Sequence, residues 1–219
     1  MKAKFLACGL FFTAIVSAGL ALSSCGPKDG WTEAERRIIS ETLAGTDSTG
    51  SRILRVLTVD NPEDSLVLRT PCKDFTPEML DTPEYTALAS LMISTVTDPS
   101  EDGVGIAGPQ VGISRRIVAV QRFDKPGEPF EVYPDIRITA VRGDTEPGPE
   151  GCLSVPGLRG EVMRYRDIDI TYATAREGSG ASETVTERIQ GFTAVIFQHE
   201  CDHLDGILYT DKAISVSQR

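Results

Sequence analysis

Both histidines of this 219-residue chain lie in one short segment, His199-Glu200-Cys201-Asp202-His203. Apolar residues recur at helical spacing between residues 191 and 204, which predicts a helix there. Successive side chains of an α-helix are about 100° apart, so those of His199 and His203 lie within about 40° of each other on one face. Both imidazoles can then reach a single metal ion. Glu200 stands at the rim of that face, where it can contact a water molecule beside the ion.

The rest of this metal site should come from an earlier part of the chain. A catalytic metal site needs a third protein ligand and an open position. The chain has no third histidine, and few residues follow His203. Cys152 stands in a segment bounded by glycine and proline residues, and a thiolate there would suit a borderline-soft ion. A lone cysteine is more often a buried apolar filler, so both interpretations stay open at this point.

The two residues between Glu200 and His203 have other expected roles. Cys201 lies about 200° around the helix from either histidine, so it should point away from the ion and fill space in the core. Asp202 could orient one of the imidazoles, but an exposed or helix-capping aspartate is an equally good interpretation.

The remaining periodicities predict strands interrupted by a few helices, without regular β-α-β alternation, and hence an α+β fold. Helices are expected near residues 32–43, where Thr32 and Glu35 have capping-box spacing, and near 83–97, where Pro83 suits the first turn. Strands are expected at residues 53–59, 65–69, 116–121, 131–138, 161–173 and 183–189. A glycine-rich loop is expected at 103–112, with turns at 143–148 and 177–182.

The start of the chain has the pattern of a secretory signal peptide. Lys2 and Lys4 precede an uncharged run, residues 5–22, which ends in Leu22-Ser23-Ser24-Cys25. This ending resembles the lipobox of bacterial lipoproteins, in which the cysteine becomes the lipidated N-terminus. Cys25 would then anchor an exported protein to a membrane, although the run is also long enough for an uncleaved transmembrane helix. The expected parts are a signal peptide at 1–24, a linker and N-terminal helix at 25–50, and a catalytic domain at 51–219.

Charge and cysteine content narrow the functional class further. The chain has 22 basic and 32 acidic residues, a net charge of −10, and no basic patch, which argues against nucleic acid as a partner. Beyond Cys8 and Cys25 in the leader, Cys72, Cys152 and Cys201 remain. Exported domains usually pair their cysteines, so at least one of these three should serve something other than a disulfide. The role of Cys72 stays open.

Three segments taken together resemble peptide deformylases. They are Gly103-Val104-Gly105-Ile106-Ala107-Gly108-Pro109-Gln110, Glu150-Gly151-Cys152-Leu153-Ser154 and Gln198-His199-Glu200-Cys201-Asp202-His203-Leu204-Asp205-Gly206, in the order that the family has. The similarity spans roughly residues 53–210 and implies mostly antiparallel strands around a central metal-binding helix. Gly108 and Tyr133 depart from the family pattern, which usually has alanine and asparagine there. The glycine should loosen its loop without removing Gln110.

The resemblance implies a metal-dependent hydrolase that converts formyl-methionyl peptides to formate and a free N-terminal methionine. Cys152, His199 and His203 would hold one divalent ion. Glu200 would take a proton from water and return it to the leaving amine. The family generally works best with Fe²⁺, so Fe²⁺ is expected in vivo, and Zn²⁺ or Ni²⁺ is expected in many preparations.

The same resemblance assigns roles to residues around the ion. The side-chain amide of Gln110 and the backbone N–H of Leu153 would stabilise the oxyanion that develops on the formyl group. Gly105 would let the substrate backbone lie close. Arg164 stands where the family keeps an arginine that pairs with the motif glutamate, so Glu150 and Arg164 are expected to brace the Cys152 loop. Two unrelated surface charges are the alternative.

The pocket for the methionine side chain should be apolar. By position, its candidates are Val104, Phe192, Val195 and Ile196. Plain core packing is the alternative, and both can hold because the metal-binding helix borders the core. Phe192 stands where the family often has leucine, which predicts a narrower pocket.

Two other functions fit part of the pattern. An exported metallopeptidase that cuts internal peptide bonds would need only the two histidines and Glu200, and a non-catalytic lipoprotein could bind formyl peptides or metal. The segments 103–110 and 150–154 argue against the metallopeptidase. The presence of Glu200, Gln110 and Cys152 together argues against the binding protein, which has no need of all three. The leader is the largest departure, because family members typically act in the cytosol or in organelles. The expected protein is a monomer on the periplasmic or cell-surface face of a membrane.

Overall fold

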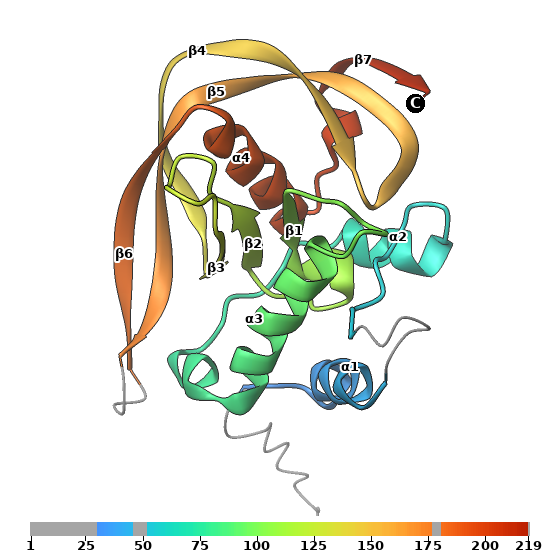
Figure 1. The fold of residues 1–219 in the computed structure, drawn as a ribbon, viewed down its shortest axis with the longest axis vertical. Helices are drawn as coiled ribbons and strands as arrows, with labels where there is room; N and C mark the ends of the chain where they lie inside the picture. Colours follow the sequence, from blue (N-terminus) through green and yellow to red (C-terminus); the bar gives the residue numbers. More distant parts are fainter. Residues whose placement is uncertain (1–29, 46–51, 177–180, 219) are drawn as a thin grey trace, which may run out of the picture.

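The computed structural model describes residues 30–45, 52–176 and 181–218. In these ranges, antiparallel sheets surround one helix, α4 (Phe192–Leu204), which carries both histidines (Figure 1). The other helices there are α1 (Glu33–Ala44), α2 (Pro62–Leu68) and α3 (Pro83–Val96), and short 3-10 turns are η1 (Pro77–Asp81), η2 (Gly108–Val111) and η3 (Tyr209–Asp211).

The strands form a smaller sheet with the order β1-β2-β3 and a larger one with the order β4-β5-β6, in which β7 also pairs with β5. Each of these pairings is antiparallel. The strands are β1 (Gly105–Ala107), β2 (Ile117–Gln121), β3 (Phe130–Pro134), β4 (Arg137–Cys152), β5 (Val155–Arg176), β6 (Ala181–Gln190) and β7 (Ala213–Gln218). β4 and β5 make one long hairpin that arches over α4 (Figure 1). The predicted α+β fold, with mostly antiparallel strands around a central helix, is confirmed.

Apolar packing fixes α4 between the two sheets. Ile196 and Phe197 of α4 lie in one buried cluster with Val118 and Val120 of β2 and Ile168 of β5. Burying an apolar side chain of this size contributes about 1.5–3 kcal/mol, so the cluster holds the helix firmly against both sheets. The orientation of the helix, and with it the direction in which its histidines point, is therefore set by the core.

The three predicted helices are confirmed, and local signals explain where two of them begin. At α1 the Thr32 side chain accepts from the backbone N–H of Glu35, whose carboxylate accepts from the N–H of Thr32, as in a capping box. At α3 the Thr82 hydroxyl accepts from the N–H of Tyr85, and Pro83 occupies the first turn.

The strand predicted at 65–69 is wrong, because most of it belongs to α2. The Asn61 side chain accepts from the N–H groups of Glu63 and Asp64, and Pro62 stands in the first turn. Short apolar runs suit strand and helix equally well, so the cap decides between them.

The strand predicted at 53–59 is also wrong. This segment is placed instead by single backbone hydrogen bonds to two later loops. The N–H of Leu57 donates to the carbonyl of Gln110, and that of Val59 donates to the carbonyl of Ser154. The segment thus links two of the three motifs that the sequence singled out.

The long hairpin corrects the other boundaries. Residues 143–148, predicted as a turn, lie inside β4, where a register shift and a positive φ of 74° at Gly143 absorb the turn-forming residues. The predicted strand 161–173 extends to 155–176, and the predicted loop 103–112 contains β1 and η2. The predicted strand 131–138 is divided between β3 and β4 at Asp135, which has a φ of 52°.

The expected signal peptide, residues 1–24, lies outside the described residues, as do Cys25 and residues 177–180 of the expected polar turn. Within the part that the structure describes, no helix combines the length and the apolar character needed to cross a bilayer.

Candidate metal centre

Three metal-binding side chains meet where the end of β4 faces α4. The ligand atoms of Cys152, His199 and His203 all lie within 4.8 Å of one another. The Cys152 Sγ is 3.2 Å from the His203 Nε2, and the two imidazole rings are 5.1 Å apart between centroids. Cys152 reaches the helix because it pairs with Val155 at the tight end of the β4–β5 hairpin. The structure thus brings together the three residues that the sequence proposed as ligands.

This donor set fits a divalent transition-metal ion. One sulfur and two imidazole nitrogens are typical ligands of Zn²⁺, Fe²⁺, Ni²⁺ or Co²⁺, and three protein ligands leave a position open. Burial alone would raise the pKa of the Cys152 thiol, but the neighbouring His203 and His199 outweigh it and hold that pKa well below its usual range. The sulfur is therefore available as a thiolate.

The carboxylate of Glu150 fixes the orientation of one ligand. Its Oε2 lies 2.8 Å from the Nδ1 of His199. Burial opposes the charge on Glu150, but hydrogen bonds from His199 and Arg164 lower its pKa to about 2. An ionised carboxylate can only accept, so the Nδ1 of His199 donates to it, which leaves Nε2 as the nitrogen available to a metal ion. Glu150 thus contacts one of the candidate ligands directly, a contact that the sequence did not reveal.

Behind Glu150 lies a chain of charges. Arg164 donates from Nε to Glu150 Oε1 at 2.7 Å and from Nη2 to Oε2 at 3.0 Å. Its remaining Nη1 donates to Asp202 at 2.6 Å, and Lys212 donates to the other oxygen of Asp202 at 2.6 Å. Asp202 therefore supports the arginine, and neither alternative proposed for it from the sequence describes this contact.

Glu200 lies in the interior beside the ligands. It is 3% exposed, and burial raises its pKa to about 7, although His199 and His203 oppose that shift. A Cβ on Gly105 would stand 2.5 Å from Glu200 Oε1 and 2.8 Å from a methyl group of Ile196. Gly105 is therefore needed so that β1 can lie against this carboxylate.

Gln110, on η2, turns its side-chain amide towards Cys152. Its Oε1 accepts from the N–H of Ala107 at 2.8 Å, so its Nε2 faces Cys152, with Sγ at 3.5 Å, and donates to Ser154 Oγ at 3.2 Å. Leu153 lines the same space as Gln110. The sequence placed Ser154 in the segment 150–154 but gave it no role, because its contact with Gln110 joins two segments 44 residues apart.

Tyr209 of η3 is another contact that sequence reasoning missed. Its ring stacks on the imidazole of His199, with a centroid distance of 6.0 Å and an angle of 23° between the planes. It therefore packs against the ring that Glu150 orients. Conversely, Cys201 is buried in the core cluster on the other side of α4.

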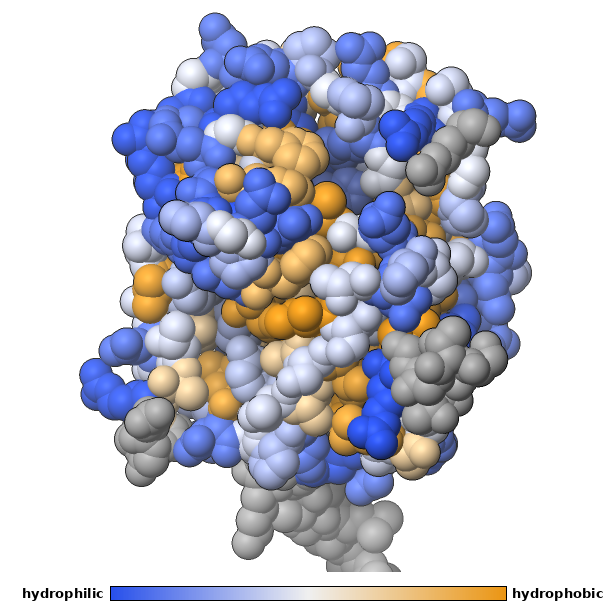
Figure 2. All heavy atoms as spheres, in the orientation of Figure 1, coloured by the Kyte–Doolittle hydropathy of each residue, from blue (hydrophilic) through white to orange (hydrophobic). Residues whose placement is uncertain are grey.

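Cys152, His199, Glu200 and Gln110 border a cleft of about 490 Å³. The four candidates for an apolar side-chain pocket, Val104, Phe192, Val195 and Ile196, all line it together with Gly105, Gln110, Leu153, His199 and Glu200. Val104 and Phe192 are 37% and 47% exposed, whereas the other two candidates are buried. Ile196 also belongs to a core cluster, so the cleft wall and the core share it. On the face seen in Figure 2, apolar side chains gather across the middle of the molecule between more hydrophilic surfaces.

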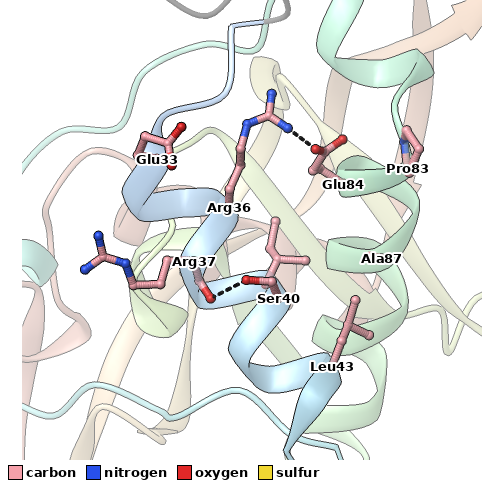
Figure 3. A pocket seen from close by; sticks show the side chains of 9 residues that line it. Glu33, Arg36, Arg37, Ser40, Leu43, Pro83, Glu84 and Ala87 are labelled. Atoms are coloured by element: carbon pink, nitrogen blue, oxygen red, sulfur yellow. Dashed lines mark hydrogen bonds and ion pairs between the residues drawn. The ribbon is translucent and has the colours of Figure 1, made fainter.

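A second hollow of about 480 Å³ lies between α1 and α3 (Figure 3). It shares no lining residue with the metal cleft, and charged and small side chains make up most of its walls. We therefore place the chemistry in the first cleft.

Comparison with known proteins matches most of the chain to one family. Residues 53–219 match the family model described as polypeptide deformylase. A peptide deformylase of Desulforudis audaxviator is 38% identical over 138 residues, which cover 63% of this chain and 83% of the relative. A peptide deformylase of Leptospira biflexa is 32% identical over 167 residues, which cover 73% and 87%.

Solved structures agree with the sequence comparison. The class I type b peptide deformylase of Acinetobacter baumannii with bound Met-Ala-Ser is 33% identical, with a TM-score of 0.63, and the match covers 74% of this chain and 99% of that one. The same enzyme with bound actinonin gives a TM-score of 0.62 at 33% identity, with the same coverage.

Replacing the sulfur ligand should separate Cys152 from Cys201. We expect Cys152→Ala to lose most of its bound metal, because two imidazoles alone hold an ion weakly, whereas Cys201→Ala should keep it. Metal per chain is measured by mass spectrometry of the desalted protein after loading with Zn²⁺. Normal metal content in Cys152→Ala, with the fold intact by circular dichroism, would show that Cys152 is not a ligand.

Proposed function

The chain belongs to the peptide deformylase family, and from this premise we propose which catalytic and binding roles its residues have. It is a hydrolase that removes the formyl group from formyl-methionyl peptides and releases formate. The observation that carries the assignment to this cleft is the group of one thiolate and two imidazoles beside the buried carboxylate of Glu200.

We propose that Cys152, His199 and His203 hold one divalent ion. When bound, this ion supplies Lewis-acid chemistry, which makes a water molecule acidic near neutral pH and polarises the formyl carbonyl. Glu200 accepts the proton of the attacking water at its carboxylate and returns it to the amine nitrogen as the C–N bond breaks. Burial raises the pKa of Glu200 to about 7, which suits both the uptake and the return of the proton. A group that carries a proton works best when its pKa lies near the working pH.

Two donors are aimed at the oxygen on which charge develops. The Gln110 amide is held by Ala107 with its Nε2 towards the ligands, and the backbone N–H of Leu153 is the second proposed donor. Gly105 lets the peptide backbone approach Glu200. The methionine side chain lies against Val104, Phe192, Val195 and Ile196, which line the cleft.

The identity of the ion is the next part of the proposal. A thiolate with two imidazoles suits Fe²⁺, Zn²⁺ and Ni²⁺, and the resemblance to deformylases favours Fe²⁺ in vivo. Zn²⁺ or Ni²⁺ would be found in many preparations. We also propose a monomer, since one chain supplies every group of the cleft.

Glu200 tests this mechanism. Glu200→Ala should keep one metal ion per chain but lose turnover by about 10²–10⁴-fold, the usual contribution of a general acid–base group. The assay measures formate released from formyl-Met-Ala-Ser by Fe²⁺-loaded protein in the absence of oxygen. Loss of the ion from the folded variant would make Glu200 a ligand instead.

The same assay separates the competing functions. The wild-type protein should release formate and leave an unformylated peptide intact. Cleavage of the unformylated peptide would indicate an endopeptidase, and binding of the formyl peptide without release of formate would indicate a binding protein.

We further propose that the protein is an exported lipoprotein anchored through Cys25. The support is the order Lys2 and Lys4, an uncharged run over 5–22, and Leu22-Ser23-Ser24-Cys25. In this arrangement residues 1–24 are removed and residues 25–50 link the lipid to the catalytic domain at 51–219. That domain would then face the periplasm or the cell surface.

Mass spectrometry of the mature N-terminus in the native host tests the anchor. We expect an acylated Cys25 at the mature N-terminus, because Leu22-Ser23-Ser24-Cys25 follows a basic start and an uncharged run. Each buried CH₂ of the lipid would then add about 0.8 kcal/mol of membrane binding. Cys25→Ala is the control and should remain unprocessed. A chain that keeps Met1 and carries an unmodified Cys25 would contradict lipidation and favour the transmembrane helix. Membrane fractionation alone could not distinguish the two anchors, because either would hold the protein in the membrane fraction.

A further inference from the structure

The helix α1 lies before the residues that match the family, yet its N-terminal end is fixed inside the protein. The match begins at residue 53, whereas α1 spans Glu33–Ala44. Just before it, Trp31 is completely buried, and its Nε1 donates to Thr82 Oγ1 at 2.9 Å. The Trp31 ring meets Phe75 edge to face at 5.7 Å. This segment is therefore part of the folded core.

A buried ion pair joins α1 to a distant loop. Arg115 donates from Nε to Glu35 Oε1 at 2.6 Å and from Nη2 to Oε2 at 3.2 Å, and each residue is only 7% exposed. Arg115 also donates to the backbone carbonyls of Gly30 and Asp74. A guanidinium with this many partners holds its own backbone in one place.

Arg115 closes the turn that carries Gln110. Gly112 caps the end of η2, and a Cβ on Gly108 would stand 2.7 Å from the carbonyl oxygen of Arg115. The turn and the arginine backbone are thus in direct contact. A Cβ on Gly112 would lie 3.3 Å from Ile38 Cδ1, so α1 also covers the end of the turn. On its other side, the turn is continuous with β1.

The face of α1 that lies towards α3 is attached differently. Figure 3 shows it facing α3 across an open groove, with the Arg36–Glu84 ion pair at one end and Leu43 at the other. Leu43 is 40% exposed. The same helix therefore offers two apolar side chains for comparison: Ile38 lies over the active-site turn, and Leu43 borders the groove.

We propose that Glu35 and Ile38 are positioning residues for the known reaction: α1 clamps the η2 turn and so holds the Gln110 amide where the oxyanion develops. β1 secures the turn on its upstream side, and the Arg115–Glu35 pair with Ile38 secures it downstream. This inference rests on the proposed oxyanion role of Gln110.

A double-mutant cycle in the full-length, Fe²⁺-loaded enzyme tests the clamp. Glu35→Gln and Ile38→Ala should each lower kcat for formyl-Met-Ala-Ser by about tenfold, because small displacements of a catalytic group are costly, while KM stays within about twofold. In a Gln110→Ala background the same changes should have no further effect on kcat, since the group they position is gone. Leu43→Ala should leave kcat unchanged. If Glu35→Gln does not fold, Ile38→Ala, which leaves no buried charge unpaired, carries the test.

The outcomes are distinct. Equal losses of kcat with and without Gln110, equal losses in Ile38→Ala and Leu43→Ala, or no loss in Ile38→Ala would each overturn the clamp while leaving the proposed function intact. An unchanged kcat in Gln110→Ala alone would remove the oxyanion role of this residue, and the clamp with it.

Discussion

The rest of the site depends on the interaction of the buried Glu150 carboxylate with Arg164 and His199, which joins three elements of the fold. The carboxylate lies on β4, its arginine partner Arg164 on β5, and its imidazole partner His199 on α4. Removing one partner from a buried ion pair usually costs about 3–5 kcal/mol, because the other charge is left without compensation. These contacts therefore favour the arrangement of the long hairpin and the central helix in which Cys152 lies beside the two histidines.

The cleft combines this rigid side with a more open one. Apolar packing in the core fixes the position of α4. The His199 ring is held by a hydrogen bond to Glu150 and by stacking against Tyr209. Opposite them, Val104 and Phe192 keep much of their surface exposed, which leaves room for a side chain and an extended peptide. Phe192 is itself supported by Phe123, whose ring centroid lies 5.4 Å away. His199, Glu200 and His203 thus stand within α4, whereas the exposed Val104 and Phe192 lie just before β1 and at the start of α4.

Local signals in the sequence were enough for some parts of this structure and not for others. Two histidines four residues apart on a helix specify their own geometry, and the caps at Thr32 and Thr82 mark real helix starts. The apolar run at 65–69 suits a strand as well as a helix, and the cap that decides for α2, Asn61, lies outside that run. Contacts between residues far apart in the chain have no local sequence signal. Glu150 meets His199 across 49 residues, and Glu35 meets Arg115 across 80, so neither pair could be inferred from spacing.

The central claim is that one thiolate and two imidazoles of this chain hold a single ion. X-ray absorption at the zinc edge of the Zn²⁺-loaded protein tests it directly, because sulfur and nitrogen scatter differently and lie at different distances. The account predicts one sulfur at about 2.3 Å and two imidazole nitrogens at about 2.0–2.1 Å, with the remaining ligand a light atom. A first shell of nitrogen and oxygen alone, or one with a single imidazole, would contradict it.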